Sequence, residues 1–166
     1  MKTNDDLFLH FLQDIYYAER QILKALPKMA KAAESDKLKQ ALTHHQQETQ
    51  HQVERLQQVF EAIGKPARAK TCEAIQGLIE EGEEVVQDFE QGPVRDAGIA
   101  ACAQAVEHYE MARYGALIAW AKAGGHENVV SLLEETLAEE KKADALLNEI
   151  ANSDVNKKAA NLKKAA

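Results

Sequence analysis

The chain has 166 residues, a formal net charge of −7 at pH 7, few glycines and prolines, and two cysteines. A chain of this length can bury one sizeable core, and its abundance of Ala, Glu, Gln, Lys and Leu favours helices. The negative charge argues against nucleic-acid binding, which depends on cations that meet phosphates. Charges inside the N-terminal apolar stretch exclude a signal peptide or membrane span there, and two cysteines are too few for a disulfide framework. We therefore expect a soluble cytoplasmic protein with free thiols and with no membrane or nucleic-acid partner.

Five amphipathic helices are predicted in chain order, over about residues 5–33, 36–63, 71–89, 96–122 and 127–151. Asn4 or Asp5 can cap the first helix, which contains Pro27 and is therefore expected to kink. Ser35 or Asp36 can cap the second helix, and the sequence Gly-Lys-Pro at residues 64–66 ends it. The third helix is shorter and is weakened by two glycines.

The spacing of these helices predicts the fold. Short turns join the first helix to the second and the fourth to the fifth, so the members of each pair are antiparallel neighbours. A crossover of about 30 residues, which contains the short helix, connects the two pairs. We predict an all-α, ferritin-like four-helix bundle with a long crossover containing an additional short helix. It forms a single domain over residues 1–152, and the lysine-containing segment 153–166 is expected to be a basic, flexible tail.

Acidic residues lie on or near the apolar face of each long helix. Because an ideal helix turns about 100° per residue, Glu19, Glu110 and Glu140 point close to the centres of their faces, whereas Glu48 lies about 80° from its centre. At about 1.5 Å per residue, Glu19 and Glu48 differ in level along the bundle by only a few ångström, and so do Glu110 and Glu140. One acid from each of four helices can therefore meet inside the bundle.

Such a group of acids needs compensation, because burying one unpaired carboxylate costs several kcal/mol and four would repel one another. Acids from four facing helices, with an acid or a histidine one turn away, are typical of dinuclear iron or manganese sites. Glu107 lies about 80° off-centre and is either a further ligand or a partner of one, and Asp144 follows Glu140 by one turn. Alternatively, protons or the cations Arg20, Arg113 and Lys141 neutralise the acids in a metal-free protein.

Two histidines compete for the role of metal ligand on the second helix. Glu48 and His51 reproduce the Glu-x-x-His spacing of di-iron bundles, but His51 points about 140° away from the apolar centre. His45 points inward but lies about 5–7 Å further along the axis than the level of Glu19. The prediction favours His45 and leaves His51 open. The fifth helix lacks a second Glu-x-x-His, because Asp144 follows Glu140 instead.

Four segments carry a resemblance to a known family: AERQILKALPKMA at 18–30, CEAIQGLIEEGEEV at 72–85, VEHYEMARYG at 106–115 and ETLAEEKKAD at 135–144. Together they resemble the YciE/YciF stress-protein family of bacteria, over about residues 1–152. The resemblance implies a ferritin-like bundle related to rubrerythrin, a homodimer and a link to stress responses. It carries ligand roles over to Glu19, Glu48, Glu110 and Glu140.

Two functions follow as expectations. The first is a stress-response protein with a dinuclear iron or manganese carboxylate site that handles peroxide, oxygen or iron. The second is a metal-free structural or protein-interaction bundle in which the site is vestigial. Apolar residues outside the main stripe, Leu7, Phe11 and Met29, can form a dimer surface in either case.

Overall fold

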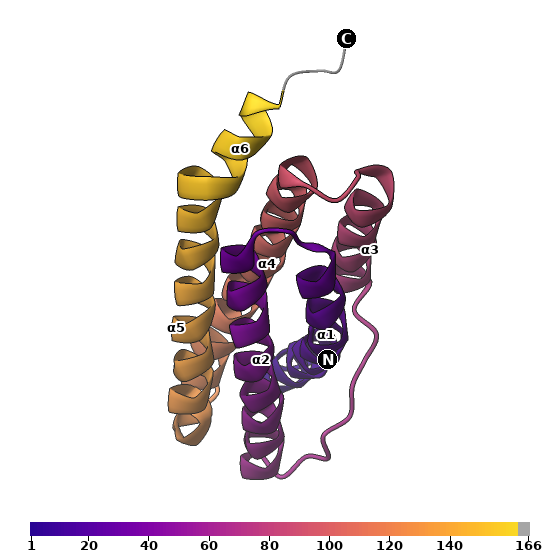
Figure 1. Cartoon of the computed structure of the whole chain (residues 1–166). Helices are drawn as coiled ribbons and strands as arrows, with labels where there is room; N and C mark the ends of the chain where they lie inside the picture. The colour runs from indigo at the N-terminus through magenta and orange to yellow at the C-terminus, as the bar shows by residue number, and fades with distance from the viewer. Residues whose placement is uncertain (163–166) are drawn as a thin grey trace.

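The computed structural model describes residues 1–162, and within them four long helices run side by side (Figure 1). The long helices are α1 (Asn4–Ala32), α2 (Asp36–Ala62), α4 (Pro93–Ala123) and α5 (Glu127–Ile150). The shorter α3 (Glu73–Asp88) lies in the crossover, and a π-helical segment (Ala151–Val155) leads from α5 into α6 (Asn156–Asn161). The predicted all-α fold with its long crossover and additional short helix is confirmed.

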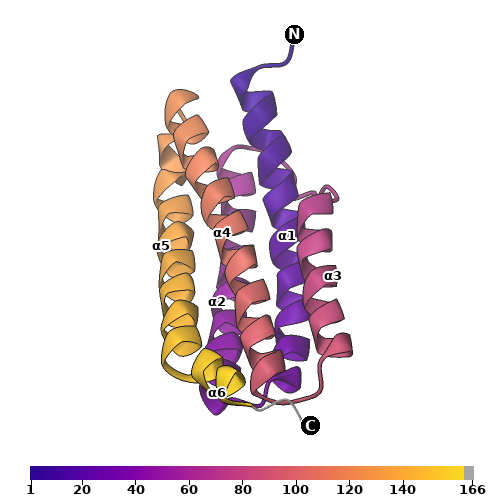
Figure 2. The same cartoon turned by 90° about the horizontal axis from the view of Figure 1, so that it is seen from above.

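The four long helices form a closed ring of neighbours. α1 packs against α2 and α4, and α5 packs against the other sides of α2 and α4. α3 lies outside this ring against α1 and α4, as Figure 2 shows. The apolar faces meet in one core, and its fully buried side chains include Leu12, Ile15, Leu56, Leu117 and Leu133. Because α4 is covered on several sides, its buried arc is wider than that of a helix that packs on one side only.

The helix ends follow local cap chemistry. Thr3, and not Asn4 or Asp5 as predicted, caps α1, because its side chain accepts from the Asp6 backbone while the Asp6 carboxylate accepts from the Thr3 backbone. Ser35 caps α2, as one of the two predicted alternatives. α4 begins at Pro93, a few residues earlier than predicted, because proline suits the first position of a helix.

Asp96 at the start of α4 fixes the tight turn between α1 and α2. Its buried carboxylate accepts hydrogen bonds from the backbone of Glu34 at 2.8 Å and of Ser35 at 2.7 Å. The Ser35 hydroxyl donates to Asp154 at 3.0 Å, and Val155 is 1% exposed. Helical structure thus continues beyond the predicted domain boundary at residue 152 and packs on the bundle, although the sequence predicted a tail there. Residues 163–166 of that predicted tail lie outside the described residues.

Two further sequence predictions concern the state of the two cysteines and the absence of a membrane-spanning segment. Both cysteines are free thiols, Cys72 buried and Cys102 half-buried. Within residues 1–162, no helix is both long enough and apolar enough to cross a membrane.

Candidate metal centre

Acidic side chains from three helices and an imidazole from a fourth converge in the bundle interior. Glu19 on α1, Glu110 on α4 and Glu140 on α5 are fully buried, and Glu107 on α4 is 2% exposed. His45, on α2, is buried beside them. One ligand atom from each of His45, Glu107, Glu110 and Glu140 lies within 4.8 Å of the others. We call these four residues together with Glu19 the acidic cluster.

His45 is the histidine that faces the cluster. Its Nε2 atom lies 3.2 Å from Oε1 of Glu107 and 3.5 Å from Oε2 of Glu140. His51, the open alternative from the sequence, is exposed. Glu107 lies one turn before Glu110, so the cluster extends along the bundle axis by about one helical pitch, roughly 5 Å. The sequence placed His45 about 5–7 Å further along the axis than Glu19. Glu107 brings the cluster to the level of His45, so the two residues meet.

Glu48 and Asp144 lie at the rim of the cluster and not inside it. Glu48 is half-buried, and its Oε2 lies 3.3 Å from Nδ1 of His45, on the ring side that faces away from the cluster. A carboxylate at Nδ1 favours the tautomer that leaves Nε2 unprotonated. Asp144 is half-buried and contacts His108 at 3.1 Å and Gln104 at 3.4 Å. The sequence placed both residues among the candidate ligands, and the structure places them around that set.

Two polar residues outside the predicted ligand set hold the acids in place. The Tyr114 hydroxyl donates to Glu19, and the Gln52 amide donates to Glu140 and, at 3.0 Å, to Glu139. Both side chains are buried. Gln52 sits at the centre of the apolar face of α2, which was a usable signal. The sequence did not indicate the role of Tyr114, because a tyrosine one turn from Glu110 could equally be a residue that only packs in the core.

The cations predicted as alternative partners of the acids lie elsewhere. Arg113 sits over the rings of Phe11, at 4.7 Å, and Tyr109, at 5.0 Å. Arg20 and Lys141 are exposed. Within residues 1–162, no lysine or arginine forms an ion pair with a member of the acidic cluster. The negative charge therefore has only the His45 imidazole as a cationic partner in this part of the chain.

Burial controls the protonation of the cluster. It raises the pKa of Glu19 to about 8, with a further contribution from the charge of Glu140, and it raises the pKa of Glu107 to about 7. The pKa values of Glu110 and Glu140 are also raised well above the usual carboxyl range, chiefly by burial. Burial opposes the charged form of His45, but the hydrogen bond with Glu48 and the charges of Glu140 and Glu19 raise its pKa overall.

Several buried atoms of the cluster have no hydrogen-bond partner. They are Oε2 of Glu19, Glu107 and Glu140, both carboxylate oxygens of Glu110, and Nε2 of His45. Buried polar atoms are normally paired, so such a concentration requires an explanation. Carboxylate oxygens with one imidazole nitrogen suit iron, manganese or zinc, and they offer more donor atoms than one ion needs. The residues therefore fit a metal centre, and shared protons between the acids are the other way to satisfy them.

Two cavities reach the cluster from opposite sides, and Glu107 lines both. A cavity of about 140 Å³ between α2 and α5 is lined by His44, His45, Glu48 and Lys142 together with alanine and leucine side chains. A cavity of about 300 Å³ between α1, α3 and α4 is mainly apolar. The first cavity brings ionisable side chains from the surface to His45.

Comparisons with known proteins agree with this architecture. The family described as "Domain of unknown function (DUF892)" matches residues 3–160. Protein YciF of Escherichia coli (strain K12) is 48% identical over 163 residues, which cover 97% of this chain and 98% of YciF.

Three solved structures share the fold. The crystal structure of the E. coli stress protein YciF matches with a TM-score of 0.90 and 46% identity, over 95% of this chain and all of that one. YcfI of Rhodopseudomonas palustris, for which a structural role has been suggested, matches with a TM-score of 0.87 and 53% identity, over 89% of this chain and 94% of its own. A protein of Xanthomonas campestris pv. campestris, at 22% identity and a TM-score of 0.74 over 93% of this chain and 94% of that one, supports the fold alone.

Proposed function

This chain belongs to the DUF892 family, and on that premise we propose that it is a stress-response protein whose acidic cluster binds a dinuclear iron or manganese centre that handles peroxide, oxygen or iron. One observation carries the proposal: buried, unpartnered carboxylate and imidazole atoms from four helices converge where no lysine or arginine of residues 1–162 pairs with them. A cation is the compensation that can take donor atoms from all four helices at once.

The residues that would hold the metal are Glu19, His45, Glu107, Glu110 and Glu140. When bound, such a centre supplies redox chemistry with oxygen or peroxide, or stores and releases an iron ion. The surrounding side chains prepare the ligands for this role. Glu48 orients the His45 ring, while Tyr114 and Gln52 fix one oxygen of Glu19 and of Glu140 and leave the other oxygen free.

Metal binding and proton release are coupled in this site. The raised pKa values of Glu19 and Glu107 mean that much of the cluster is protonated in the metal-free protein near neutral pH. Because a metal binds the deprotonated forms, its affinity should increase with pH as these protons become easier to displace.

A metal-free structural bundle is the second candidate function. Its support is the same set of raised pKa values, because acids that keep their protons can hydrogen-bond to one another without a cation. The structural role suggested for YcfI points in the same direction. In this case the protonated acids contribute only to the packing of the core and to the alignment of the four helices.

Metal content separates the two candidates. Protein purified without chelators is analysed by inductively coupled plasma mass spectrometry, together with Glu140→Gln and the matched control Glu149→Gln on the exposed side of the same helix. We expect up to two iron or manganese ions per chain in the parent protein and the control, and a large loss in Glu140→Gln. No bound metal in the parent protein, after iron and manganese are supplied during growth, would favour the structural candidate.

The homodimer remains a prediction. Leu7 is 41% exposed, whereas Phe11 and Met29, the other residues predicted for a dimer surface, are half-buried. Phe11 packs on Trp120 with ring centroids 5.2 Å apart, and Met29 lines the apolar cavity. Sedimentation equilibrium at several concentrations measures the mass of the particle, and a monomer throughout would overturn the prediction.

A further inference from the structure

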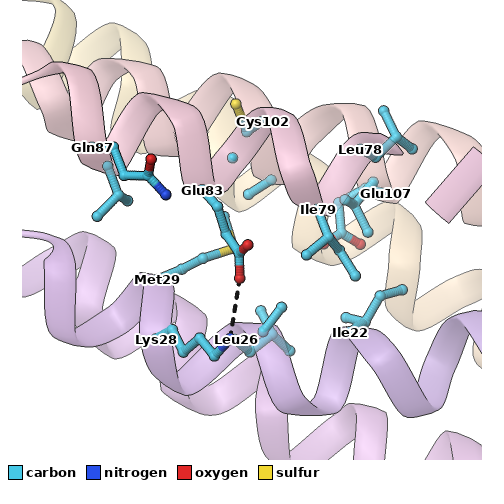
Figure 3. A pocket seen from close by; sticks show the side chains of 15 residues that line it. Ile22, Leu26, Lys28, Met29, Leu78, Ile79, Glu83, Gln87, Cys102 and Glu107 are labelled. Carbon is cyan, nitrogen blue, oxygen red and sulfur yellow. Dashed lines mark hydrogen bonds and ion pairs between the residues drawn. The ribbon is translucent and has the colours of Figure 1, made fainter. Parts of the chain in front are cut away.

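The apolar cavity between α1, α3 and α4 extends from the surface of the bundle to the acidic cluster (Figure 3). Its volume of about 300 Å³ lies at the lower end of the range for ligand pockets. Ile22 and Leu26 of α1, Leu78 and Ile79 of α3, and Ala103 and Val106 of α4 supply apolar walls. In Figure 3, Gln87 and Met29 lie toward one end, and Glu107 lies beside Ile79 at the other. The shape and lining suit a short aliphatic chain.

Glu107 gives the inner end of the cavity a specific chemistry. Its side chain is almost fully buried, and its Oε2 atom has no hydrogen-bond partner. This oxygen can accept a hydrogen bond from a ligand that enters along the apolar walls. A ligand hydroxyl can donate to this oxygen, whereas an ionised ligand carboxylate has only acceptor atoms, so a neutral hydroxyl fits best.

The outer side of the cavity is closed only weakly. Lys28 of α1 and Glu83 of α3 form an ion pair at 3.1 Å across it, and both side chains are well exposed. Exposed pairs of this kind contribute little free energy, so their separation is a small barrier to entry. The cavity is thus accessible from solvent without rearrangement of the helices.

We propose that this cavity binds a small neutral aliphatic molecule, with its chain along the α1–α3–α4 walls and a hydroxyl group at Glu107. Binding itself does not require a metal. That the ligand is a substrate rests on the proposed function, because Glu107 also belongs to the acidic cluster and would place the hydroxyl end beside the metal. The smaller cavity between α2 and α5, which Glu107 also lines, is a separate opening toward the cluster.

The methionines provide a direct test. The chain has three, and Met29 lines the cavity whereas Met111 does not. In protein as isolated, with ¹³C-methyl methionine, n-octanol should shift the Met29 methyl signal saturably and leave Met111 unchanged. Nuclear Overhauser effects should connect Met29 with the terminal methyl of n-octanol, because the hydroxyl lies at the other end. Octanoate should bind at least roughly tenfold more weakly, since its carboxylate cannot donate to Glu107.

Matched variants locate the binding. Gly82→Leu adds a side chain to a buried cavity-lining position, where the first carbon makes only ordinary contact with Cys102 at 3.7 Å. It should abolish the Met29 shift. Gly77→Leu makes the same change on the same helix at an exposed position with open space around it, and should leave binding intact. Glu107→Gln should narrow the preference for n-octanol over octanoate, because the glutamine amide can donate a hydrogen bond to a carboxylate.

Several results would overturn the proposal. They are an unchanged Met29 signal, equal binding of octanoate and n-octanol, or equal loss of binding in both glycine variants. A Met29 signal that changes with protein concentration alone would show that a second copy of the chain covers the cavity. If Gly82→Leu does not fold, the Overhauser contacts in the parent protein decide the matter. Metal content measured on the same samples tests the proposed function separately, and Gly82→Leu should retain its metal.

Discussion

His45 and Glu107 meet inside the bundle, with Nε2 of the imidazole 3.2 Å from Oε1 of the carboxylate. This contact joins α2 to α4 and places an imidazole nitrogen at the edge of a group of acids. Glu48 lies 3.3 Å from the other ring nitrogen and holds the His45 ring from that side, which leaves Nε2 facing the cluster. His45 is therefore the one member of the acidic cluster that offers a nitrogen atom as a metal ligand. Its mutation tests the proposed metal site specifically.

Replacement of His45 should weaken metal binding. Isothermal titration calorimetry on chelator-treated His45→Gln should show that it binds Mn²⁺ at least roughly tenfold more weakly than the parent protein. Mutation of a residue that only hydrogen-bonds a metal ligand already lowers metal affinity by about tenfold or more, so loss of the ligand itself should do at least as much. His51→Gln changes an exposed histidine on the same helix and should bind Mn²⁺ like the parent protein. Reduced affinity in His51→Gln with normal affinity in His45→Gln would contradict the assignment of the ligand.

The metal-free protein should become less stable as pH rises. The folded-state pKa values of Glu19, about 8, and Glu107, about 7, lie above those of the unfolded chain. The folded protein therefore keeps protons that the unfolded chain has lost, and the free energy of unfolding falls from about pH 5 to about pH 8. The raised pKa of His45 acts in the same direction. Urea unfolding in chelator should show a loss of about 2 kcal/mol or more over this range.

Bound metal should flatten or reverse this trend, because it replaces the protons and stabilises the deprotonated cluster. The same urea series with saturating Mn²⁺ is therefore the control. Metal-free protein that becomes more stable from pH 5 to pH 8 would show that the acids are not held as the structure indicates.

Glu110 should stabilise the fold only when metal is present. It is fully buried, and neither of its oxygens has a hydrogen-bond partner. In chelator-treated protein, Glu110→Met should raise the free energy of unfolding by about 1–4 kcal/mol, because an apolar side chain of similar size removes a buried acid. The exposed change Glu149→Met should have almost no effect. A metal-free Glu110→Met variant that is clearly destabilised would mean that protons already satisfy this carboxyl.

The helix faces explain which parts of the cluster the sequence could predict. The 100° rotation rule placed Glu19, Glu110 and Glu140 near the centres of apolar faces, and the structure buries all three. Glu107 was left open because it lies off-centre on α4. It is buried because α4 is covered by α3 as well as by α1 and α5, so a single-face description of this helix was too narrow.

Other features depend on tertiary contacts that a helix wheel does not contain. The hydroxyl of Tyr114 reaches from α4 to Glu19 on the neighbouring α1, and Arg113 lies over aromatic rings instead of beside Glu110. Helical structure beyond residue 152 was missed because Val155 is an isolated apolar residue among polar ones. Its burial, and the contact of Asp154 with Ser35, appear only when the α1–α2 turn is in place.

Arg55 should stabilise the bundle next to the cluster. It is buried, donates to Thr136 at 2.6 Å and forms two bonds of 3.0 Å with the Glu139 carboxylate, which tie α2 to α5. Arg55→Met should reduce the free energy of unfolding by about 3 kcal/mol, because it leaves the partly buried Glu139 carboxylate without its cationic partner. Lys122→Met breaks an exposed pair with Glu134 at 2.8 Å and should cost less than about 1 kcal/mol. If Arg55→Met and Lys122→Met lowered stability equally in thermal or urea unfolding, Arg55 would not have the stabilising role proposed for it.

Anomalous diffraction at the iron and manganese absorption edges, from crystals of protein purified without chelators, tests the metal centre most directly. We expect anomalous peaks among Glu19, His45, Glu107, Glu110 and Glu140, close enough to their oxygen and nitrogen atoms for direct coordination. Maps without such peaks after the protein has been supplied with both metals, and with the carboxyl oxygens in direct contact with one another, would show that protons alone hold the cluster together.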